Sequence, residues 1–410
     1  MSGHILFLAH RLPFPPDRGD KIRSHHVLKA LAELGPVHVG CLAESEADYA
    51  HEYQLAAIAA SYTMPPRRKS LLVSGLSALR RQEPVSCAAF RSDEMAHWVR
   101  QTLANYPVDT IYVFSGQMGQ YVPDEFSGRL VVDLVDVDSA KFEQYARDAR
   151  FPMRLVHGRE AHLLHRIECD LSSRADVTLL VSQEEAELLR ERIGPGIGNI
   201  RALGNGIDCT AFDPATVQPA RELLRAGPHI TFTGQMDYPP NIGAAERFAT
   251  SILPAIRQRF TSALFHIVGR APTDAVQALG NLPGVLVHGE VADIRAFLAG
   301  SDIVTAPLLL ARGVQNKVLE AMAMARAVVL SAEAARGIPA IDGEHFAVGS
   351  RDHELIERAI ALLGDKTARN TMGRAARDFV ESQMRWEAQL ADLPAIMGGG
   401  LRVREKRDAA

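Results

Sequence analysis

The chain has 410 residues, is 47% hydrophobic and 23% charged, and carries a formal net charge of -4. This length exceeds what one ordinary hydrophobic core serves and predicts two domains, and the composition is typical of a folded protein. The small negative charge excludes the chain-wide basic field that nucleic-acid binding usually needs. We therefore expect no nucleic-acid partner, and any anion site must be local.

The cysteines and the N-terminal residues bear on the compartment. Cys41, Cys87, Cys169 and Cys209 are far apart and form no CxxC pair, which argues against a zinc ribbon or a disulfide framework and favours a reducing cytoplasm. The opening MSGHILFLAHRLPFPP has no basic leader, so it is interpreted as a first strand and not as a signal peptide. No apolar run approaches the roughly 18–20 residues of a membrane span. We expect a cytoplasmic protein.

Short apolar runs alternate with helical patterns through the first half of the chain. A first helix is expected at about 22–34, and strands are expected at HILFLA, VHVGCL, TIYVFS, LVVDLV and VTLLVS. This alternation is typical of a parallel, doubly wound sheet. Residues 1–214 are therefore predicted to form a Rossmann-like domain on the acceptor side.

The same rhythm restarts at HITFTG and continues through ALFHIVG, VLVHG, DIVTAP and AVVLS. We predict an α/β fold of two Rossmann-like, doubly wound domains, the second covering 229–383. The stretch 212–228 holds three prolines and no strand pattern, which favours a linker at 215–228. A last helix at 384–397 is expected to cross back to the first domain, and 398–410 to form a flexible tail.

The loop after the first strand is a candidate phosphate site. In open α/β sheets ligands lie beyond the carboxyl ends of the strands, and two facing sheets would place that cleft between the domains. Within HRLPFPPDRGDKIRSHH, Gly19 closes a proline-rich loop, and the next helix begins around Asp20 to Ile22. Its backbone N–H groups are suited to a phosphate. The alternative is a glycine needed only for a tight turn.

A sharper candidate is the helix that opens near Asn316, after the strand DIVTAP. Lys317 and Glu320 are three residues apart and share a face of this otherwise apolar helix. A buried carboxylate needs a partner. Either Lys317 neutralises Glu320 as a structural pair, or Glu320 accepts hydrogen bonds from ligand hydroxyls such as a ribose diol while Lys317 meets a diphosphate.

The segment LVVDLVDVDSAKF ends a strand with three aspartates. Asp136 or Asp138 is placed by this pattern at the cleft, near an acceptor hydroxyl, as a base or an orienting group. The alternative for Asp138 is the N-cap of a helix starting at Ser139. The histidines show no metal spacing, and no metal site is expected.

Several of these segments, in order along the chain, resemble the glycosyltransferase family 4 group and its GT-B relatives. They are PPDRGDKIRSHH, LGNGIDCTAF, FTGQMDYPPN, HIVGR, HGEVADIRAFLAGSDIVTAP and GVQNKVLEAMAMARAVVLS. Four segments are most similar to sugar transferases associated with PEP-CTERM/exosortase exopolysaccharide systems. Their sequences are AHRLPFPPDRGDKIRS, DLVDVDS, TGQMDYPPN and RGVQNKVLEAMAMA. This resemblance implies sugar addition to a lipid-linked acceptor or a growing polysaccharide.

The resemblance also implies the donor site. It places Glu320 at the ribose-binding position of the family's ExxxxxxxE region. The other donor-binding residues that it implies are Asn316, Lys317, Arg312, Gly234, Gly269, Arg270, Glu290 and Val291, with Gly19 and Asp20 in the phosphate-side loop.

Two positions depart from the family pattern. Arg312 stands eight residues before Glu320, where the family often has its first glutamate, and Gln235 stands where a phosphate-binding arginine is common. Arg312, Lys317 and Arg270 are candidates to supply the missing positive charge by another geometry.

The expected reaction is metal-independent transfer of a sugar from a nucleoside diphosphate donor to a hydroxyl acceptor, with no cofactor. Electrostatic stabilisation of the leaving diphosphate is the main catalytic contribution. Retention of anomeric configuration is implied by the resemblance alone. The alternatives are a nucleotide-sugar 2-epimerase and a non-catalytic glycosyltransferase-like scaffold. A dinucleotide oxidoreductase is disfavoured because neither half has a GxGxxG turn after its first strand.

Residues 65–84, PPRRKSLLVSGLSALRRQEP, combine leucines with five cations and one acid. A short helix of this kind is suited to the surface of an anionic bilayer, where it would present the first domain to a lipid-linked acceptor. The alternative is a helix packed on the sheet with a solvated basic edge.

Overall fold

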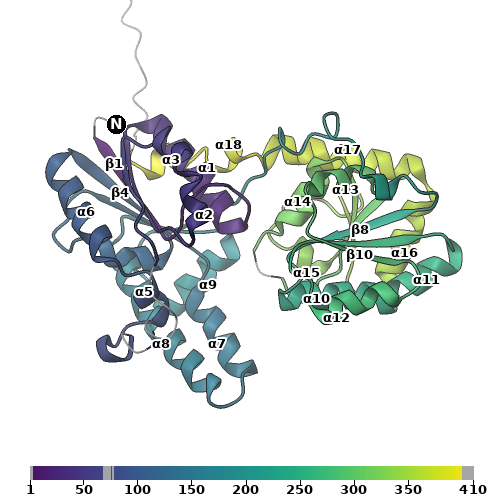
Figure 1. Ribbon diagram of the computed structural model, residues 1–410, viewed down its shortest axis with the longest axis horizontal. Helices are drawn as coiled ribbons and strands as arrows, with labels where there is room; N and C mark the ends of the chain where they lie inside the picture. The colour runs from purple at the N-terminus through teal and green to yellow at the C-terminus, as the bar shows by residue number, and fades with distance from the viewer. Residues whose placement is uncertain (1–2, 68–74, 76–77, 312, 399–410) are drawn as a thin grey trace, which may run out of the picture. The chain divides into compact units, whose positions relative to one another are not determined.

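The computed structural model describes residues 3–67, 75, 78–311 and 313–398, and it divides into two compact units (Figure 1). Unit 1 comprises the chain up to Gly204 together with the segment from Leu390, and unit 2 comprises Asn205–Gln389. The division therefore lies ahead of the linker expected at 215–228. That stretch belongs to unit 2, because Leu223 is buried against Val268 and Phe297.

Unit 1 is built on a parallel sheet of seven strands in the described residues, ordered β3-β2-β1-β4-β5-β6-β7. The strands are β1 His4–Ala9, β2 Val37–Cys41, β3 Ser61–Thr63, β4 Val108–Phe114, β5 Arg129–Val135, β6 Val177–Leu180 and β7 Ile200–Ala202. The helices are α1 Gly19–Leu34, α2 Glu46–Tyr49, α3 Glu52–Ala56, α5 Val85–Ala89, α6 Asp93–Asn105, η1 Gly116–Tyr121, α7 Asp138–Asp148, α8 Met153–Arg174, α9 Gln183–Ile193 and α19 Leu393–Ile396.

Unit 2 is built on a parallel sheet of six strands in the same described set, ordered β10-β9-β8-β11-β12-β13. The strands are β8 His229–Thr233, β9 Leu264–Val268, β10 Val285–Gly289, β11 Ile303–Ala306, β12 Ala327–Ser331 and β13 Ala347–Gly349. The helices are η2 Arg221–Leu223, α10 Pro239–Arg247, η3 Phe248–Ile252, α11 Leu253–Arg259, α12 Asp274–Ala278, η4 Leu279–Asn281, α13 Ile294–Gly300, α14 Asn316–Ala323, α15 Ala332–Ala335, α16 Asp352–Gly364, α17 Lys366–Gln383 and α18 Trp386–Gln389.

The two Rossmann-like sheets confirm the predicted fold class. The inner strands are buried on both faces, as parallel strands covered by helices must be, and β2 and β12 are buried along their whole length, whereas the edge strands β3 and β10 are only partly buried. In each sheet the strand order reverses once, between β1 and β4 and between β8 and β11. Loops at the carboxyl ends of such switch points are where open α/β sheets bind ligands. In unit 2 these loops lead into α10 and α14.

The C-terminal segment differs from the single helix expected at 384–397. The structure has two short helices, α18 and α19, separated by Leu390–Asp392. Pro394 stands in the first turn of α19, where its missing N–H breaks no hydrogen bond. Arg129 Nε donates to the carbonyl oxygen of Ile396 at 2.6 Å, so α19 is held by unit 1, whereas α18 belongs to unit 2.

Parts of two expectations fall on residues that the structure does not describe. Residues 68–74 and 76–77 lie within the proposed membrane helix at 65–84, and 399–410 make up almost all of the expected tail. Among the helices that are described, none is long and apolar enough to cross a membrane.

Candidate functional site

Two glycines bring the ends of β8 and β9 into close contact in unit 2. A Cβ atom on Gly269 would stand 1.6 Å from the carbonyl oxygen of Gly234, and Gly234 N donates to the Val268 carbonyl at 3.1 Å. A side chain at 269 is therefore excluded by backbone and not merely disfavoured. The result is a bare stretch of backbone at the carboxyl end of the sheet, next to the switch point.

Lys317 lies over this bare backbone. Its Nζ donates to Asn241 Oδ1 at 2.5 Å, lies 4.9 Å from the centre of the Phe232 ring, and would be 3.2 Å from a Cβ atom on Gly234. Burial lowers the pKa of Lys317 to about 8, although the charge of Glu320 opposes that shift. A largely protonated ammonium thus faces a neutral amide and not a carboxylate.

Glu320 follows one turn later on α14 and remains partly open to solvent. Burial raises the pKa of its carboxyl to about 7, and the charge of Lys317 opposes the shift. Within the described part of the chain its carboxylate has no hydrogen bond and no ion pair within 4.0 Å. The structural ion pair that the sequence left open is therefore not formed here. Such a carboxylate has acceptor capacity for a ligand.

Asn316 opens α14 beside these residues. Its side-chain oxygen is buried and has no hydrogen-bond partner among the described residues. This oxygen is therefore available to accept a hydrogen bond. The N-terminus of this eight-residue helix adds its own positive potential, because no side chain caps it.

Arg270 and Gln235 connect the loop that follows Gly234 with the loop that follows Gly269. Arg270 Nη2 donates to Gln235 Oε1 at 3.0 Å, and Met236 N donates to the Arg270 carbonyl at 2.9 Å. Gln235 thus takes part in the site without supplying charge, and Arg270 brings a cation to the same loop. Arg312 lies outside the described residues.

Glu290 and Val291 follow β10, the edge strand on this side of the sheet. Val291 packs against the cluster of Leu223, Val268 and Phe297, and Glu290 is exposed. Neither side chain is hydrogen-bonded to the α14 residues in the described structure. The structure therefore brings together Gly234, Gly269, Asn316, Lys317 and Glu320, with Arg270 at the rim, and leaves Glu290 and Val291 one strand further out.

The predicted phosphate loop of unit 1 is already occupied by the chain's own charges. Asp20 pairs with Arg11, with His10 Nε2 at 3.2 Å and with Arg18 Nε at 3.4 Å. Burial opposes ionisation of Asp20, but the hydrogen bond from His10 and the charge of Arg11 hold its pKa well below the usual range. Nothing lies within 4 Å of a Cβ atom on Gly19.

Glu44 completes this cluster. It pairs with Arg11 Nε at 2.7 Å, with Arg67 Nη1 at 3.2 Å and with Arg18. Three arginines therefore meet two carboxylates, and an added anion would have to compete with Asp20 or Glu44. Sequence reasoning identified Asp20 and missed Arg11, Arg18, Arg67 and Glu44 as its partners.

Asp136 follows a strained turn at the carboxyl end of β5. Val135 has φ +70°, and Asp136 N donates to the Leu134 carbonyl at 2.9 Å, two residues back. This is the rare, strained form of the γ-turn, and a β-branched residue there is an outlier. Such strain gathers at functional sites.

The environment of Asp136 favours the protonated carboxyl. The side chain is exposed on one side, yet burial on the other, together with the nearby Glu185 carboxylate, raises its pKa to about 6. A carboxyl that titrates near neutrality can take and return protons.

Asp138 is more strongly bound by its neighbours. Lys141 Nζ donates to it at 2.5 Å and Gln117 Nε2 at 3.4 Å. It is the first residue of α7 and caps nothing, so the alternative of an N-cap does not apply. Glu168 serves that end instead, accepting from Ser139 N at 2.9 Å.

Asp133 is structural. Arg23, 1% exposed, donates to its two oxygens at 2.9 and 3.2 Å, and Tyr112 donates at 2.8 Å. Arg23 also donates to the Leu203 carbonyl at 2.7 Å, where the chain leaves unit 1. An aspartate inside the apolar run LVVDLV was the available signal, because a buried carboxylate requires a cation.

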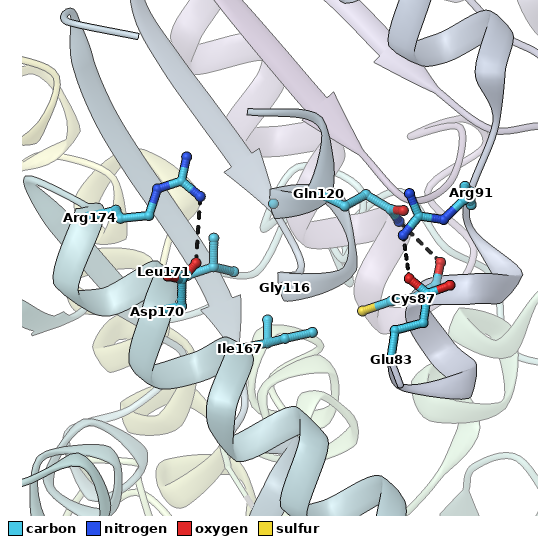
Figure 2. A pocket seen from close by; sticks show the side chains of 10 residues that line it. Glu83, Cys87, Arg91, Gly116, Gln120, Ile167, Asp170, Leu171 and Arg174 are labelled. Carbon is cyan, nitrogen blue, oxygen red and sulfur yellow. Dashed lines mark hydrogen bonds and ion pairs between the residues drawn. The ribbon is translucent and has the colours of Figure 1, made fainter. Parts of the chain in front are cut away.

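Unit 1 also contains a cavity of about 150 Å³ between α5, η1 and α8 (Figure 2). Cys87, Ile167 and Leu171 give it apolar walls, and burial raises the pKa of the Cys87 thiol to about 12. Its cations are already paired, Arg91 with Glu83 and Arg174 with Asp170. The cavity therefore offers no unpaired charge to an anion. No group of three His, Cys, Asp or Glu in the described structure is placed to hold a metal.

Comparisons with known proteins agree on this architecture. Residues 227–365 match the family model described as glycosyl transferases group 1. A GDP-mannose-dependent alpha-(1-6)-phosphatidylinositol monomannoside mannosyltransferase of Mycobacterium tuberculosis is 29% identical over 247 residues, which are 55% of this chain. The match spans 62% of that relative's length.

Two solved structures show the same fold. Alr3699/HepE of Anabaena, in complex with UDP and glucose, superposes with a TM-score of 0.67 at 16% identity, covering 97% of this chain and 100% of its own. A sucrose-phosphate synthase from Thermosynechococcus elongatus gives a TM-score of 0.66 at 16% identity, covering 96% and 98%. The chain therefore has the GT-B fold.

Proposed function

We propose that this chain, which contains a glycosyl transferases group 1 domain at residues 227–365, transfers a sugar from a nucleoside diphosphate donor to a hydroxyl acceptor. The observation that carries the proposal is the arrangement in unit 2: an ammonium hydrogen-bonded only to an amide, and a carboxylate without a partner in the described structure, both beside bare backbone at the sheet's switch point. Lys317 and Glu320 lie within the matched domain. A cation and an acceptor at this spacing suit a diphosphate and a ribose diol.

Lys317 is the proposed diphosphate ligand. Its hydrogen bond to Asn241 is to a neutral group, so a phosphate oxygen is the stronger partner and displaces it. The uncapped N-terminus of α14 and Arg270 add positive potential around the same loops. This charge stabilises the leaving diphosphate, which is the main catalytic contribution in the proposed reaction.

Glu320 is the proposed ribose ligand. Two hydroxyl donors would satisfy its carboxylate and favour the ionised form, so donor binding is expected to lower the pKa of Glu320 from about 7. The Asn316 side-chain oxygen is a further acceptor at this end of the helix.

On the acceptor side we propose Asp136 as the group that receives or orients the acceptor hydroxyl. Its pKa of about 6 supports this role better than the environment of Asp138, which is bound by Lys141. The proposed acceptor is a lipid-linked or polysaccharide hydroxyl in exopolysaccharide synthesis at the cytoplasmic face of a membrane. Support comes from the likeness to PEP-CTERM-associated transferases and from the mycobacterial relative, whose name specifies GDP-mannose and a phosphatidylinositol monomannoside. Retention of configuration is part of the same proposal.

A panel of UDP, GDP and ADP sugars tests the proposal by thermal shift and product analysis. At least one nucleoside diphosphate should raise the melting temperature, and sugar transfer should require an added acceptor. Lys317→Ala should abolish the shift, whereas the exposed Lys366→Ala should retain it. No shift with any nucleotide contradicts the proposal and favours a scaffold. Epimerised sugar formed from donor alone favours the 2-epimerase.

A further inference from the structure

The α7–α8 hairpin extends beyond the core of unit 1. Its two helices pack along each other, and Figure 1 draws the turn between them at the end away from the sheet. The 22 residues of α8 span about 33 Å at 1.5 Å per residue. The first buried residue of α8 is Glu160, seven positions after its start at Met153. The tip of the hairpin is therefore not held by packing against the sheet.

This tip is apolar and exposed. Seven consecutive residues, 150–156, are all exposed, and their sequence is RFPMRLV. Phe151 is 80% exposed and Leu155 65%, and Met153 and Val156 are each nearly half exposed. Single exposed apolar residues are ordinary, but a contiguous group on a protruding turn marks an interaction surface.

The charges around these apolar side chains are mainly positive. Arg147, Arg150 and Arg154 are exposed, and none has an ion pair within 4.0 Å in the described structure. The single acid among them, Asp148, accepts a hydrogen bond from Gln144. Three cations against one anion leave this surface positive. Arg159, in contrast, points back to unit 1 and donates to the Ala78 carbonyl at 3.0 Å.

We infer that the hairpin tip, residues 145–156, docks this protein on the surface of an anionic lipid bilayer. Phe151 and Leu155 enter the boundary between headgroups and acyl chains, and Arg147, Arg150 and Arg154 lie at the level of the lipid phosphates. Tyr145, 42% exposed, adds an aromatic ring of the kind found at membrane interfaces. The purpose of the docking rests on the proposed function, because it brings unit 1 to a lipid-linked acceptor.

Charge complementarity favours a bilayer over a second copy of the chain. Pairing two identical tips would bring their arginines together, and like charges at close range oppose association. A bilayer with anionic lipids supplies both the apolar layer and the negative surface that this tip matches. The tip residues 145–156 are a different part of the sequence from the segment at 65–84, which the structure describes only in part.

The test uses the full-length protein and phosphatidylcholine vesicles with and without phosphatidylglycerol. Wild type should co-sediment with the anionic vesicles, less so as salt is raised. Phe151→Ser/Leu155→Ser should lower the partition coefficient at least about tenfold, because it removes the inserted apolar surface. Arg150→Glu/Arg154→Glu should lower it by a similar factor.

Unit 2 offers matched controls. Leu224 is 70% exposed and stands between the exposed arginines Arg221 and Arg225. Leu224→Ser and Arg221→Glu/Arg225→Glu should leave vesicle binding unchanged. Phe151→Trp should show a blue shift of its emission with anionic vesicles, and Leu224→Trp should not.

Several outcomes would overturn the inference. These are absence of wild-type binding at low salt, equal loss in the tip variants and in the unit 2 controls, or concentration-dependent dimerisation that the tip variants abolish. A nucleotide-binding measurement tests the proposed function independently of vesicle binding. Tip variants should bind nucleoside diphosphates as wild type does, and vesicle binding by a protein that binds no nucleotide would retain the docking surface and reject the transferase.

Discussion

The two units are alike at the amino ends of their strands and differ at the carboxyl ends. In unit 1, His4 on β1 hydrogen-bonds His38 on β2 at 2.8 Å, and in unit 2, His229 on β8 hydrogen-bonds His266 on β9 at 2.9 Å. The registers are equivalent, because His38 stands opposite Leu6 and His266 opposite Thr231, each two residues after the first histidine. The sequence alone suggested no repeat beyond a common rhythm.

The chain of imidazoles in unit 2 has a defined tautomer. His229 Nε2 lies 3.0 Å from the Arg225 carbonyl, which only accepts, so this nitrogen carries the proton. His266 then donates to His229, and His288 donates to His266 at 2.9 Å. Burial, and then the neighbouring His288, lower the pKa of His266 to about 3, which keeps the His266 imidazole neutral. These contacts join the neighbouring strands β8, β9 and β10.

At the carboxyl ends of the strands, the cations of the two units have different partners. In unit 1 the arginines at the switch point are neutralised by Asp20 and Glu44. In unit 2 the cation Lys317 donates to the amide of Asn241 and lies over the Phe232 ring, and no carboxylate of the described residues pairs with it. In unit 1 the ion pairs stabilise the fold. In unit 2 the ammonium of Lys317 has no carboxylate partner among the described residues, and the proposed function assigns it to a phosphate. The substitutions below test this contrast.

The largest effect is expected at the buried pair of unit 1. Asp133→Ala should lower the free energy of unfolding by about 3–5 kcal/mol, because it leaves the guanidinium of Arg23 buried without its carboxylate. Chemical denaturation measures this loss. The control is Asp124→Ala, which breaks the ion pair of an aspartate that is 94% exposed and should cost about 1 kcal/mol or less. Equal losses would mean that the Asp133 pair is not a structural element.

Lys317→Ala should have the opposite profile. We expect a loss of about 3 kcal/mol in transition-state stabilisation, roughly a hundredfold in kcat/KM for the donor, with little change in unfolding free energy. Steady-state kinetics and denaturation curves on the same preparation measure both quantities, with Lys366→Ala as the control. A variant that unfolds readily but turns over normally when folded would assign Lys317 to structure.

Glu320→Gln should weaken donor use by about 1.5–3 kcal/mol, since a charged hydrogen bond to the ribose becomes a neutral one. The fold should survive because no ion pair is lost. Donor affinity is measured by titration with the nucleotide sugar. Unchanged affinity and rate would remove Glu320 from the donor site.

Glu320 also predicts a pH dependence of stability without ligand. Its pKa is about 7 in the folded protein against 4.5 for an unperturbed glutamate, so it stabilises the fold below pH 4.5 and loses that contribution as pH rises to 7. Relative to Glu320→Gln, wild type should lose about 2 kcal/mol across this window. Parallel denaturation series at several pH values measure the difference. A constant difference across pH would show that Glu320 is not perturbed.

The smallest effect is expected at Arg270. Arg270→Ala should weaken nucleoside diphosphate binding by about 1 kcal/mol and leave binding of the bare nucleoside unchanged, because the guanidinium is at the solvent-exposed rim. Competition binding with the two ligands measures the difference. A larger loss than for Lys317→Ala would move the main phosphate contact to this loop.

The fold followed from the sequence because its signals are local. HILFLA is β1 as expected, and HITFT within HITFTG is β8, since buried parallel strands are short apolar runs. The boundaries of units and helices that depend on tertiary contacts could not be predicted from the sequence as well. The proline-rich stretch 215–228 suggested a linker, but Leu223 packs into unit 2, and Pro394 begins a new short helix where one continuous helix was expected.

The sequence indicated which residues belong to the candidate site better than it indicated what those residues contact. The spacing of Lys317 and Glu320 on one helix face indicated chemistry, but the partner of Lys317 is Asn241, 76 positions away, which no local pattern indicates. The same limit hid Arg23, which meets Asp133 at a separation of 110 positions. The strain at Val135 was also not predictable, because it depends on how β5 joins α7.

The most direct test of the central claim is calorimetric titration of wild type and Lys317→Ala with UDP, GDP and the matching nucleosides. We expect one diphosphate to bind wild type more tightly than its nucleoside, and Lys317→Ala to lose at least about tenfold in affinity for the diphosphate while retaining affinity for the nucleoside. Equal affinities of wild type and Lys317→Ala for the diphosphate would contradict the account.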